Sequence, residues 1–196
     1  MMITCVEIEN DIIKNNLITS NWNSNEYFYN TLEYVENSGL WLEFGVATGR
    51  TINIISSRTT NKVYGFDTFQ GLPEDWDDHQ GKGVYSQDGV LPKVNSNVEL
   101  IVGLFQDTLE EFLDEHPEPI AYLHIDADLY SSTKYVFDNI EDRIVPGTVI
   151  SFDEVYNNQV YLDHEMKAWV EFANKTEIRY NWITRTPHEQ ASLIIK

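Results

Sequence analysis

The sequence predicts an α/β fold in which helices cover both faces of a doubly wound, mostly parallel sheet. Five short runs of nearly continuous apolar residues are typical of parallel strands that are buried on both faces. The runs are residues 40–46, 62–67, 98–103, 120–126 and 148–154. Helical patterns alternate with these runs, and right-handed βαβ crossovers then give a Rossmann-like order of strands. Residues 176–186 and 190–196 have the pattern of two further strands, which predicts an antiparallel pair at one edge of the sheet.

Three helices are predicted from their capping residues and their apolar stripes. The first, residues 107–116, has Thr108 as a cap with Glu111 three residues later, which is the pattern of a capping box. The other two are residues 131–144, which begin on Ser and Thr caps, and residues 163–175, which begin on Asp163.

The length and composition favour one globular domain over residues 1–196. Apolar residues make up 42% of the chain and aromatic residues 13%, which argues against disorder. We expect a helical segment up to about residue 38, and a lid-like loop over about 70–97, where Gly, Asp and Pro are frequent and no periodicity is seen.

The charge of the chain restricts its partners. Lys and Arg number 13 against 32 Asp and Glu, a formal net charge of −19, which disfavours nucleic acid and anionic membrane surfaces. The single cysteine, the absence of a signal-peptide pattern and the absence of a membrane-spanning run favour a cytoplasmic protein.

The first strand ends in the turn "EFGVATGR", which carries Glu43, Gly45 and Gly49. Glycines in a turn between strand and helix let a ligand approach the backbone, although they also serve a tight turn without any ligand. Asp67 ends the second strand, where an acid can hold the two hydroxyls of a ribose or, alternatively, cap a helix.

The spacing E-x-G-x-x-x-G in the first turn differs from both common phosphate-binding patterns. It lacks the G-x-G-x-x-G of dinucleotide-binding proteins and the G-K-[ST] of phosphate loops. A nucleoside without a pyrophosphate is therefore expected, and S-adenosylmethionine is the obvious candidate because its sulfonium suits an acidic protein.

Acidic residues follow two more strands, at Asp126 and Asp128 and at Asp153 and Glu154. If these strands are neighbours, their axes lie about 4.8 Å apart and the carboxylates converge. Carboxylate oxygens without a nearby cysteine favour a hard dication, Mg²⁺ before Zn²⁺. The alternative is that these acids cap helices or contact an amine of a ligand.

With these residues assembled, the chain resembles the class I S-adenosylmethionine-dependent methyltransferases, and specifically the macrocin O-methyltransferase family, which acts on sugar hydroxyls. The stretches that carry the resemblance lie within residues 41–172. They are "LEFGVATGRTINII", "YGFDTFQGLPEDW", "GLFQDTLEEFL", "LHIDADLYSSTKYVF", "PGTVISFDEVY" and "HEMKAWVEF".

The resemblance implies roles for individual residues. It implies that Asp126, Asp153 and Glu154 hold Mg²⁺ and that Asp128 is the general base. It also implies a cofactor site, with Phe105 and Gln106 beside adenine as in catechol O-methyltransferases. The expected cofactor-binding residues are Glu43, Gly45, Thr48, Gly49, Asp67, Thr68, Phe105, Gln106 and Asp126. Glu74 and Tyr130 are expected to face the substrate.

Two departures from the family pattern bear on these roles. Glu154 stands where the family usually has a second Asp, and the longer side chain would shift the metal. The N-terminal part is also shorter than in antibiotic-tailoring members, so the identity of the substrate does not carry over.

The function expected is Mg²⁺-dependent transfer of a methyl group to a hydroxyl of a small molecule, such as a sugar or a vicinal diol. A metal-dependent hydrolase and an inactive cofactor-binding module remain as alternatives. The aromatic segment "NWNSNEYFYNTLEYV" would pack either on a second copy of the chain, giving a homodimer, or on its own sheet.

Overall fold

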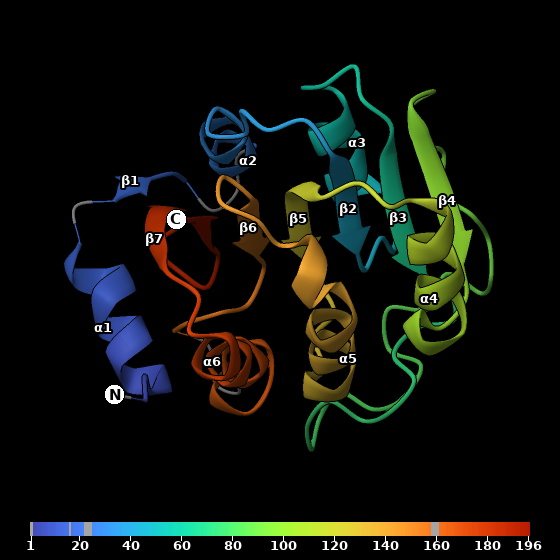
Figure 1. Cartoon of the computed structure of the whole chain (residues 1–196). Coiled ribbons are helices and arrows are strands. Elements are labelled where there is room, and N and C mark those ends of the chain that lie inside the picture. Colours follow the sequence, from blue (N-terminus) through green and yellow to red (C-terminus); the bar gives the residue numbers. More distant parts are fainter. Residues whose placement is uncertain (1, 16, 22–24, 158–160) are drawn as a thin grey trace.

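A computed structural model describes residues 2–15, 17–21, 25–157 and 161–196. The described strands form a single mixed sheet with the order β1-β7-β8-β6-β5-β2-β3-β4 (Figure 1). The strands are β1 (Ile18–Thr19), β2 (Leu40–Phe44), β3 (Val63–Asp67), β4 (Val98–Val102), β5 (Ile120–Ile125), β6 (Val149–Phe152), β7 (Tyr180–Arg185) and β8 (Ala191–Ile195).

Five strands at the centre and one side of the sheet, β2 to β6, are parallel to one another, and β8 pairs antiparallel with both β6 and β7. The predicted fold class is therefore confirmed, including the antiparallel C-terminal pair. One detail differs from the expectation. The short β1 pairs parallel with β7, so the antiparallel pair has a further strand outside it.

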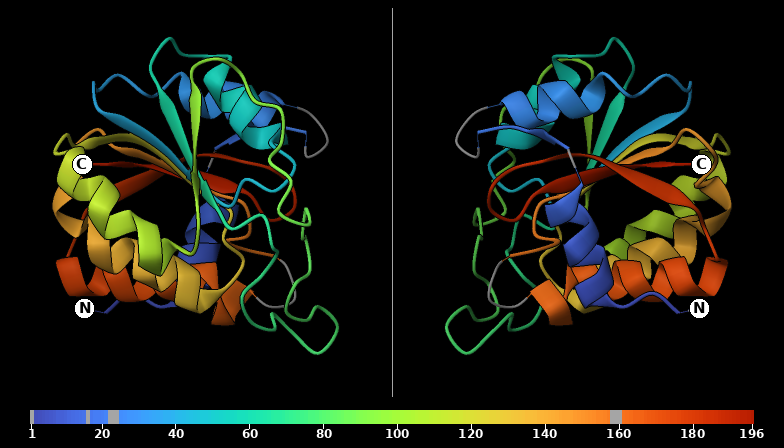
Figure 2. Two further views of the ribbon diagram at one scale, coloured as in Figure 1. Left: turned by 90° about the vertical axis from the view of Figure 1, so that its right-hand side faces the viewer. Right: turned by 90° about the vertical axis from the view of Figure 1, so that its left-hand side faces the viewer.

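Helices cover both faces of the sheet, as predicted (Figure 2). The helices are α1 (Cys5–Lys14), α2 (Glu26–Leu32), α3 (Arg50–Ser56), α4 (Phe105–Glu115), α5 (Tyr130–Ile140) and α6 (Glu165–Thr176), with 3₁₀ turns at Glu141–Arg143 and Tyr161–Asp163. One face carries α1, α4, α5 and α6, and the other carries α2 and α3. Each layer buries its own apolar cluster against the sheet.

The aromatic residues of α2 pack on the chain's own sheet. Tyr27 is fully buried and Phe28 is 2% exposed, both within the cluster that includes Trp41 of β2. Residues 22–24 of the same aromatic segment lie outside the described residues. The choice between packing on the sheet and packing on a second copy is thus settled for these two side chains.

The predicted helix starts were wrong. α4 begins at Phe105, and Thr108 lies inside it, where its hydroxyl donates to the Leu104 carbonyl at 3.0 Å. α5 begins at Tyr130, ahead of the expected Ser and Thr caps, and α6 begins after His164 rather than Asp163. None of these three helices has a side-chain hydrogen bond at its N-cap position. Capping propensity therefore does not decide where these three helices begin.

The parallel order brings the ends of β2, β3, β5 and β6 to one edge of the sheet. The segment between β3 and β4, residues 68–97, leaves from this edge and contains no helix or strand, in agreement with the expected irregular loop. Among the described residues, no helix is both long and apolar enough to cross a membrane.

Candidate active site

A cavity of about 300 Å³ lies at the carboxyl edge of the sheet. It brings together nine of the residues predicted from the sequence. They are Gly45, Asp67, Thr68, Phe105, Gln106, Asp126, Asp128, Asp153 and Glu154. Because these residues come from the ends of β2, β3, β5 and β6 and from the start of α4, the fold assembles them from distant parts of the chain. This is the edge at which open α/β sheets bind ligands.

Gly45 lies where the ends of three strands approach closely. Its φ of 91° is in the left-handed region, and a Cβ atom added to it would lie 1.8 Å from the carbonyl oxygen of Asp126. The amide of Gly45 donates to Phe66 at 3.0 Å, and that of Asp126 donates to Phe44 at 2.9 Å. A glycine is therefore required here by the packing of the backbone, whether or not a ligand binds.

Gly49 has a different environment. It is the N-cap residue of α3 with φ 77°, and an added Cβ would lie 3.0 Å from Cβ of Pro92 in the irregular loop. Within the described chain, Thr48 and Gly49 are not among the residues that line the cavity.

Asp67 ties the first turn to the end of β3. Its Oδ2 accepts from the amides of Val46 at 2.8 Å and Ala47 at 2.7 Å, and its Oδ1 accepts from Phe69 at 2.7 Å. The irregular loop follows β3 directly, so Asp67 does not cap a helix. A carboxylate can accept about four hydrogen bonds, so one acceptor site is left for a ligand hydroxyl in the cavity.

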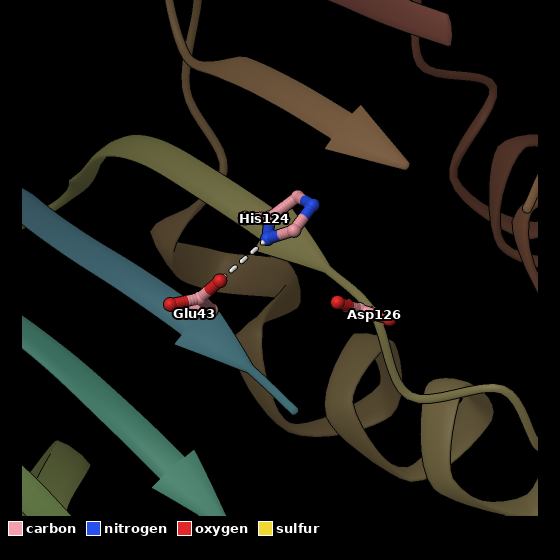
Figure 3. Close-up of side chains that lie close together, drawn as sticks. All are labelled: Glu43, His124 and Asp126. Atoms are coloured by element: carbon pink, nitrogen blue, oxygen red, sulfur yellow. Dashed lines mark hydrogen bonds and ion pairs between the residues drawn. The ribbon is translucent and has the colours of Figure 1, made fainter. Parts of the chain in front are cut away.

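Glu43 and His124 form a buried pair close to Asp126, which lines the cavity (Figure 3). His124 Nδ1 lies 2.9 Å from Glu43 Oε1, and both side chains are completely buried. Burial, followed by the negative charges of Asp153 and Asp67, raises the pKa of Glu43 well above its usual value. Burial also lowers the pKa of His124 to about 4. Burial therefore favours the neutral form of both groups.

The pair leaves two polar atoms without a hydrogen-bond partner among the described residues, Glu43 Oε2 and His124 Nε2. Together with Asp126, the pair forms the set of three acidic or imidazole ligands whose donor atoms lie within 4.8 Å of one another. Asp126, Asp153 and Glu154, the predicted metal ligands, are not such a set in the described ranges. They do, however, line one cavity.

The cavity is strongly acidic. Asp67, Asp126, Asp128, Asp153 and Glu154 line it, and none of the described lining residues is Lys, Arg or His. Burial and the nearby Asp153 raise the pKa of Asp128 to about 7 and that of Asp126 well above its usual value. Burial and the neighbouring Glu165 and Asp128 raise the pKa of Glu154 to about 10. A set of carboxylate oxygens with no Lys, Arg or His among the described residues of its cavity fits a hard divalent ion.

Two side chains that the sequence did not point to hold the acidic loops. Glu165, the first residue of α6, accepts from the amides of Ala127 and Glu154. Gln190, which precedes β8, donates from Nε2 to Asp153 Oδ1. The string "HEMKA" contained the first of these, but nothing in the sequence indicates that its acid points inward toward two other loops.

The two residues expected to face a substrate, Glu74 and Tyr130, make hydrogen bonds to residues outside the lining of the cavity. Glu74 accepts a hydrogen bond from the hydroxyl of Ser131. The hydroxyl of Tyr130 donates to Glu171 at 2.7 Å, and Lys167 Nζ lies 4.3 Å from the centre of its ring. Neither residue is among the described residues that line the cavity.

Tyr85, from the irregular loop, lines the cavity in their place. Its hydroxyl donates to Gln80 Oε1 at 2.8 Å, and its φ of 65° is in the left-handed region, which a bulky residue rarely adopts. Burial and the negative charges of Asp128 and Glu154 raise its pKa to about 12. No periodicity in the loop could have indicated this tyrosine.

Solved structures with this fold include several methyltransferases. CalS11, a calicheamicin methyltransferase, is 22% identical with a TM-score of 0.68, over 87% of this chain and 76% of that one. The O-methyltransferase NovP is 20% identical with a TM-score of 0.63, over 87% and 76%. An O-methyltransferase from Bacillus cereus in complex with SAH is 15% identical with a TM-score of 0.59, over 97% and 88%. At these identities the likeness shows the fold.

No curated protein sequence matches the chain. A family model described as "Methyltransferase domain" matches residues 42–155, which include the last three residues of β2, all of β3 to β6 and every residue predicted to bind cofactor or metal. Because the match spans more than half of the 196 residues, the chain belongs to this family of methyltransferase domains.

Proposed function

We propose that this chain is a Mg²⁺-dependent O-methyltransferase that uses S-adenosylmethionine and acts on a hydroxyl of a small molecule, a sugar or a vicinal diol. One observation carries the proposal. One cavity is lined on one side by the residues expected to bind a nucleoside, including Asp67. It also contains four further carboxylates, and none of its described lining residues is cationic; the four are Asp126, Asp128, Asp153 and Glu154.

The cofactor would occupy the side of the cavity formed by β2, β3 and α4. Asp67 has an acceptor site left for a ribose hydroxyl, and Phe105 and Gln106 at the start of α4 would contact adenine. Gly45 would lie at the methionine end. Glu43 would act there only indirectly, through the turn that it supports, because its side chain is buried against His124.

The metal would bind on the opposite side, to carboxylate oxygens of Asp126, Asp153 and Glu154. A bound Mg²⁺ lowers the pKa of a hydroxyl that contacts it. Asp128 lies in the same cavity, and its pKa is raised to about 7, which is near the value that suits a general base at neutral pH. We assign to Asp128 the removal of the hydroxyl proton. The acceptor oxygen would then attack the methyl carbon while the bond from that carbon to the sulfonium sulfur breaks, which releases neutral S-adenosylhomocysteine and leaves the proton on Asp128.

The acceptor would enter beneath the irregular loop, which we propose to act as a lid. Gly71, Leu72 and Pro73 of this loop line the cavity, as does Tyr85. A diol or a sugar is favoured because adjacent hydroxyls can chelate a dication and hold one oxygen in line for transfer. A sugar is also consistent with a relative of the same fold, CalS11, which is described as a TDP-rhamnose 3'-O-methyltransferase.

The high negative charge supports neither nucleic acid nor an anionic membrane as a partner. A homodimer and a cytoplasmic location remain expectations of the proposal.

Calorimetry with S-adenosylmethionine and MnCl₂, followed by an assay of S-adenosylhomocysteine release with sugar and catechol acceptors, tests the proposal. We expect both ligands to bind the wild type and turnover to require the metal. Asp126→Asn should abolish metal-dependent turnover, whereas Asp114→Asn, which removes a charge from an exposed position of α4, should not. A hydrolase would not bind the nucleoside, and an inactive module would bind it without consuming it.

A further inference from the structure

Glu165 is a completely buried acid in a position that connects two acidic loops. Its Oε1 accepts from the amide of Ala127 at 3.1 Å, between Asp126 and Asp128. Its Oε2 accepts from the amide of Glu154 at 3.2 Å. The two loops follow β5 and β6, which are paired up to Ile125 and Phe152. One side chain thus bonds to the backbone of both loops immediately beyond the last paired residues.

Burying a carboxyl group costs several kcal/mol unless hydrogen bonds compensate for the lost water. The two backbone amides offset only part of this cost, because burial and the negative charges of Asp153 and Asp128 outweigh them and raise the pKa of Glu165 well above its usual value. The preceding residue holds the same region, because His164 Nδ1 accepts from the amide of Tyr130 at 3.2 Å. The start of α6 is therefore bonded to both acidic loops and to the first residue of α5.

The loops need such a connection because their own side chains repel one another. The negative charge of Asp153 is among the causes that raise the pKa of Asp126, Asp128 and Glu154. Beyond Ile125 and Phe152, the amide of Asp153 still donates to the Ile125 carbonyl at 2.9 Å, but no ladder pairing continues. Glu165 itself is not among the described residues that line the cavity, so it is placed to fix the loops and not to touch a ligand.

We propose that Glu165 is a positioning residue that sets the spacing between the Asp126–Asp128 loop and the Asp153–Glu154 loop, and thereby the geometry of the metal-binding carboxylates. The proposal rests on the proposed function for the role of these carboxylates. Groups that orient metal ligands in this indirect way typically change metal affinity about 10- to 100-fold when they are removed.

The experiment compares Glu165→Gln and Glu165→Ala with wild type and with Glu110→Gln, a control that makes the same Glu-to-Gln change at an exposed position of α4. Three quantities are measured. They are the Kd of Mn²⁺ by electron paramagnetic resonance, the Kd of S-adenosylhomocysteine by calorimetry, and the hydrogen exchange of the Ala127 and Glu154 amides by NMR. All are recorded well below the melting temperature of each variant.

We expect Glu165→Ala to weaken Mn²⁺ binding about 30-fold or more and Glu165→Gln to weaken it by a smaller factor, about 3- to 10-fold. The amide oxygen of Gln still accepts one of the two hydrogen bonds, so rescue should be partial. Nucleoside affinity should stay within about twofold of wild type, since the nucleoside wall lies on β2, β3 and α4. The exchange of both amides should accelerate in Glu165→Ala.

Equal loss of Mn²⁺ affinity in Glu165→Gln and Glu165→Ala would overturn the proposal, because it would indicate a role of the charge itself. Unchanged Mn²⁺ affinity in both variants would also overturn it. If Glu165→Ala does not fold, the isosteric Glu165→Gln alone tests the proposal. Weaker Mn²⁺ binding together with faster exchange at one of the two amides supports it, and unchanged Mn²⁺ affinity overturns it. If the wild type binds no Mn²⁺, the metal dependence in the proposed function is wrong. Amide exchange then tests Glu165 separately: faster exchange of the Ala127 and Glu154 amides in the variants supports its role in holding the two loops, and unchanged exchange refutes it.

Discussion

Glu43 and His124 face each other as direct partners in the pairing of β2 with β5, with 2.9 Å between Oε1 and Nδ1. Both are fully buried in the middle of the sheet. Burial raises the pKa of the acid and lowers that of the imidazole to about 4, so it favours the neutral form of both groups. The pair is a buried polar contact close to Asp126 of the acidic cavity.

The first prediction concerns the pH dependence of stability. The pKa of Glu43 is raised in the folded protein. Its contribution to the free energy of unfolding is therefore fully present below pH 4.5, its usual pKa, and is lost as the pH rises toward the folded-state pKa. The pKa of His124 is lowered from 6.5 to about 4. Its contribution to the free energy of unfolding is therefore fully present above pH 6.5 and does not change with pH there. Above pH 6.5, Glu43 should therefore reduce the free energy of unfolding as the pH rises, by at most about 1.4 kcal/mol per pH unit.

Urea unfolding of wild type and Glu43→Gln at several pH values from about 6.5 to 8.5 checks this prediction. The variant should show a flatter decline, because Gln does not titrate and can still bond to His124. The other acids are common to both proteins and cancel in the difference. Parallel curves would mean that Glu43 is ionised in the folded protein.

The second prediction concerns the proposed base. Asp128→Asn should lower kcat about 100-fold or more, because the amide cannot take the acceptor proton. The Kd of Mn²⁺ should change little, since Asp128 is not one of the proposed ligands. Steady-state assays and a metal titration test both statements, with Asp114→Asn as the charge control. A wild-type kcat would remove Asp128 from the role.

The third prediction concerns Gly45. In Gly45→Ala the Cβ would lie 1.8 Å from the carbonyl oxygen of Asp126, and φ is 91°. We expect a loss of about 3 kcal/mol or more in the free energy of unfolding. Gly83→Ala is the matched control, because φ is 86° there and no atom lies within 4 Å of the added Cβ. It should lose about 1 kcal/mol. Equal losses in urea unfolding would show that strain alone, and not the contact with Asp126, sets the requirement for glycine.

The fourth prediction concerns Tyr85 as a residue of the acceptor side. Tyr85→Ala should raise the KM of the acceptor about tenfold, because the ring forms part of the cavity wall. Tyr85→Phe should behave like wild type, since the hydroxyl bonds to Gln80 and leaves only the ring to contact the acceptor. Initial-rate measurements at saturating cofactor distinguish the variants. An increase in KM for Phe as large as that for Ala would assign the effect to the hydroxyl.

The strands could be predicted from the sequence because short, continuous apolar runs that alternate with helical patterns are typical of parallel strands buried on both faces. The helix starts could not, since Leu104 and Leu129 occupy N-cap positions without a capping hydrogen bond. Most of the predicted residues that line the cavity lie at or just beyond a strand end, such as Asp67 and Asp126, and the others lie at the start of α4.

Glu43 shows why the rest of the site could not be predicted. It lies one residue before the end of β2, inside the ladder, and its side chain turns into the layer between sheet and helices. A shift of one or two residues along a strand decides whether an acid meets a ligand or a neighbouring strand. The positions of Glu165 and Tyr85 at the site depend on how α6 and the irregular loop fold back toward the edge of the sheet. The periodicity of the sequence does not predict this.

The short β1 has a consequence for handling the protein. Its pairing with Thr184 and Arg185, extended by the Ser20 amide on the Arg185 carbonyl at 3.0 Å, shields part of an outer strand that would otherwise offer unpaired backbone groups. Trimming the chain before residue 21 would leave that border open to pairing between molecules, which promotes aggregation. Any truncation for expression is therefore better made elsewhere, and an N-terminal tag should be separated from this segment by a flexible spacer.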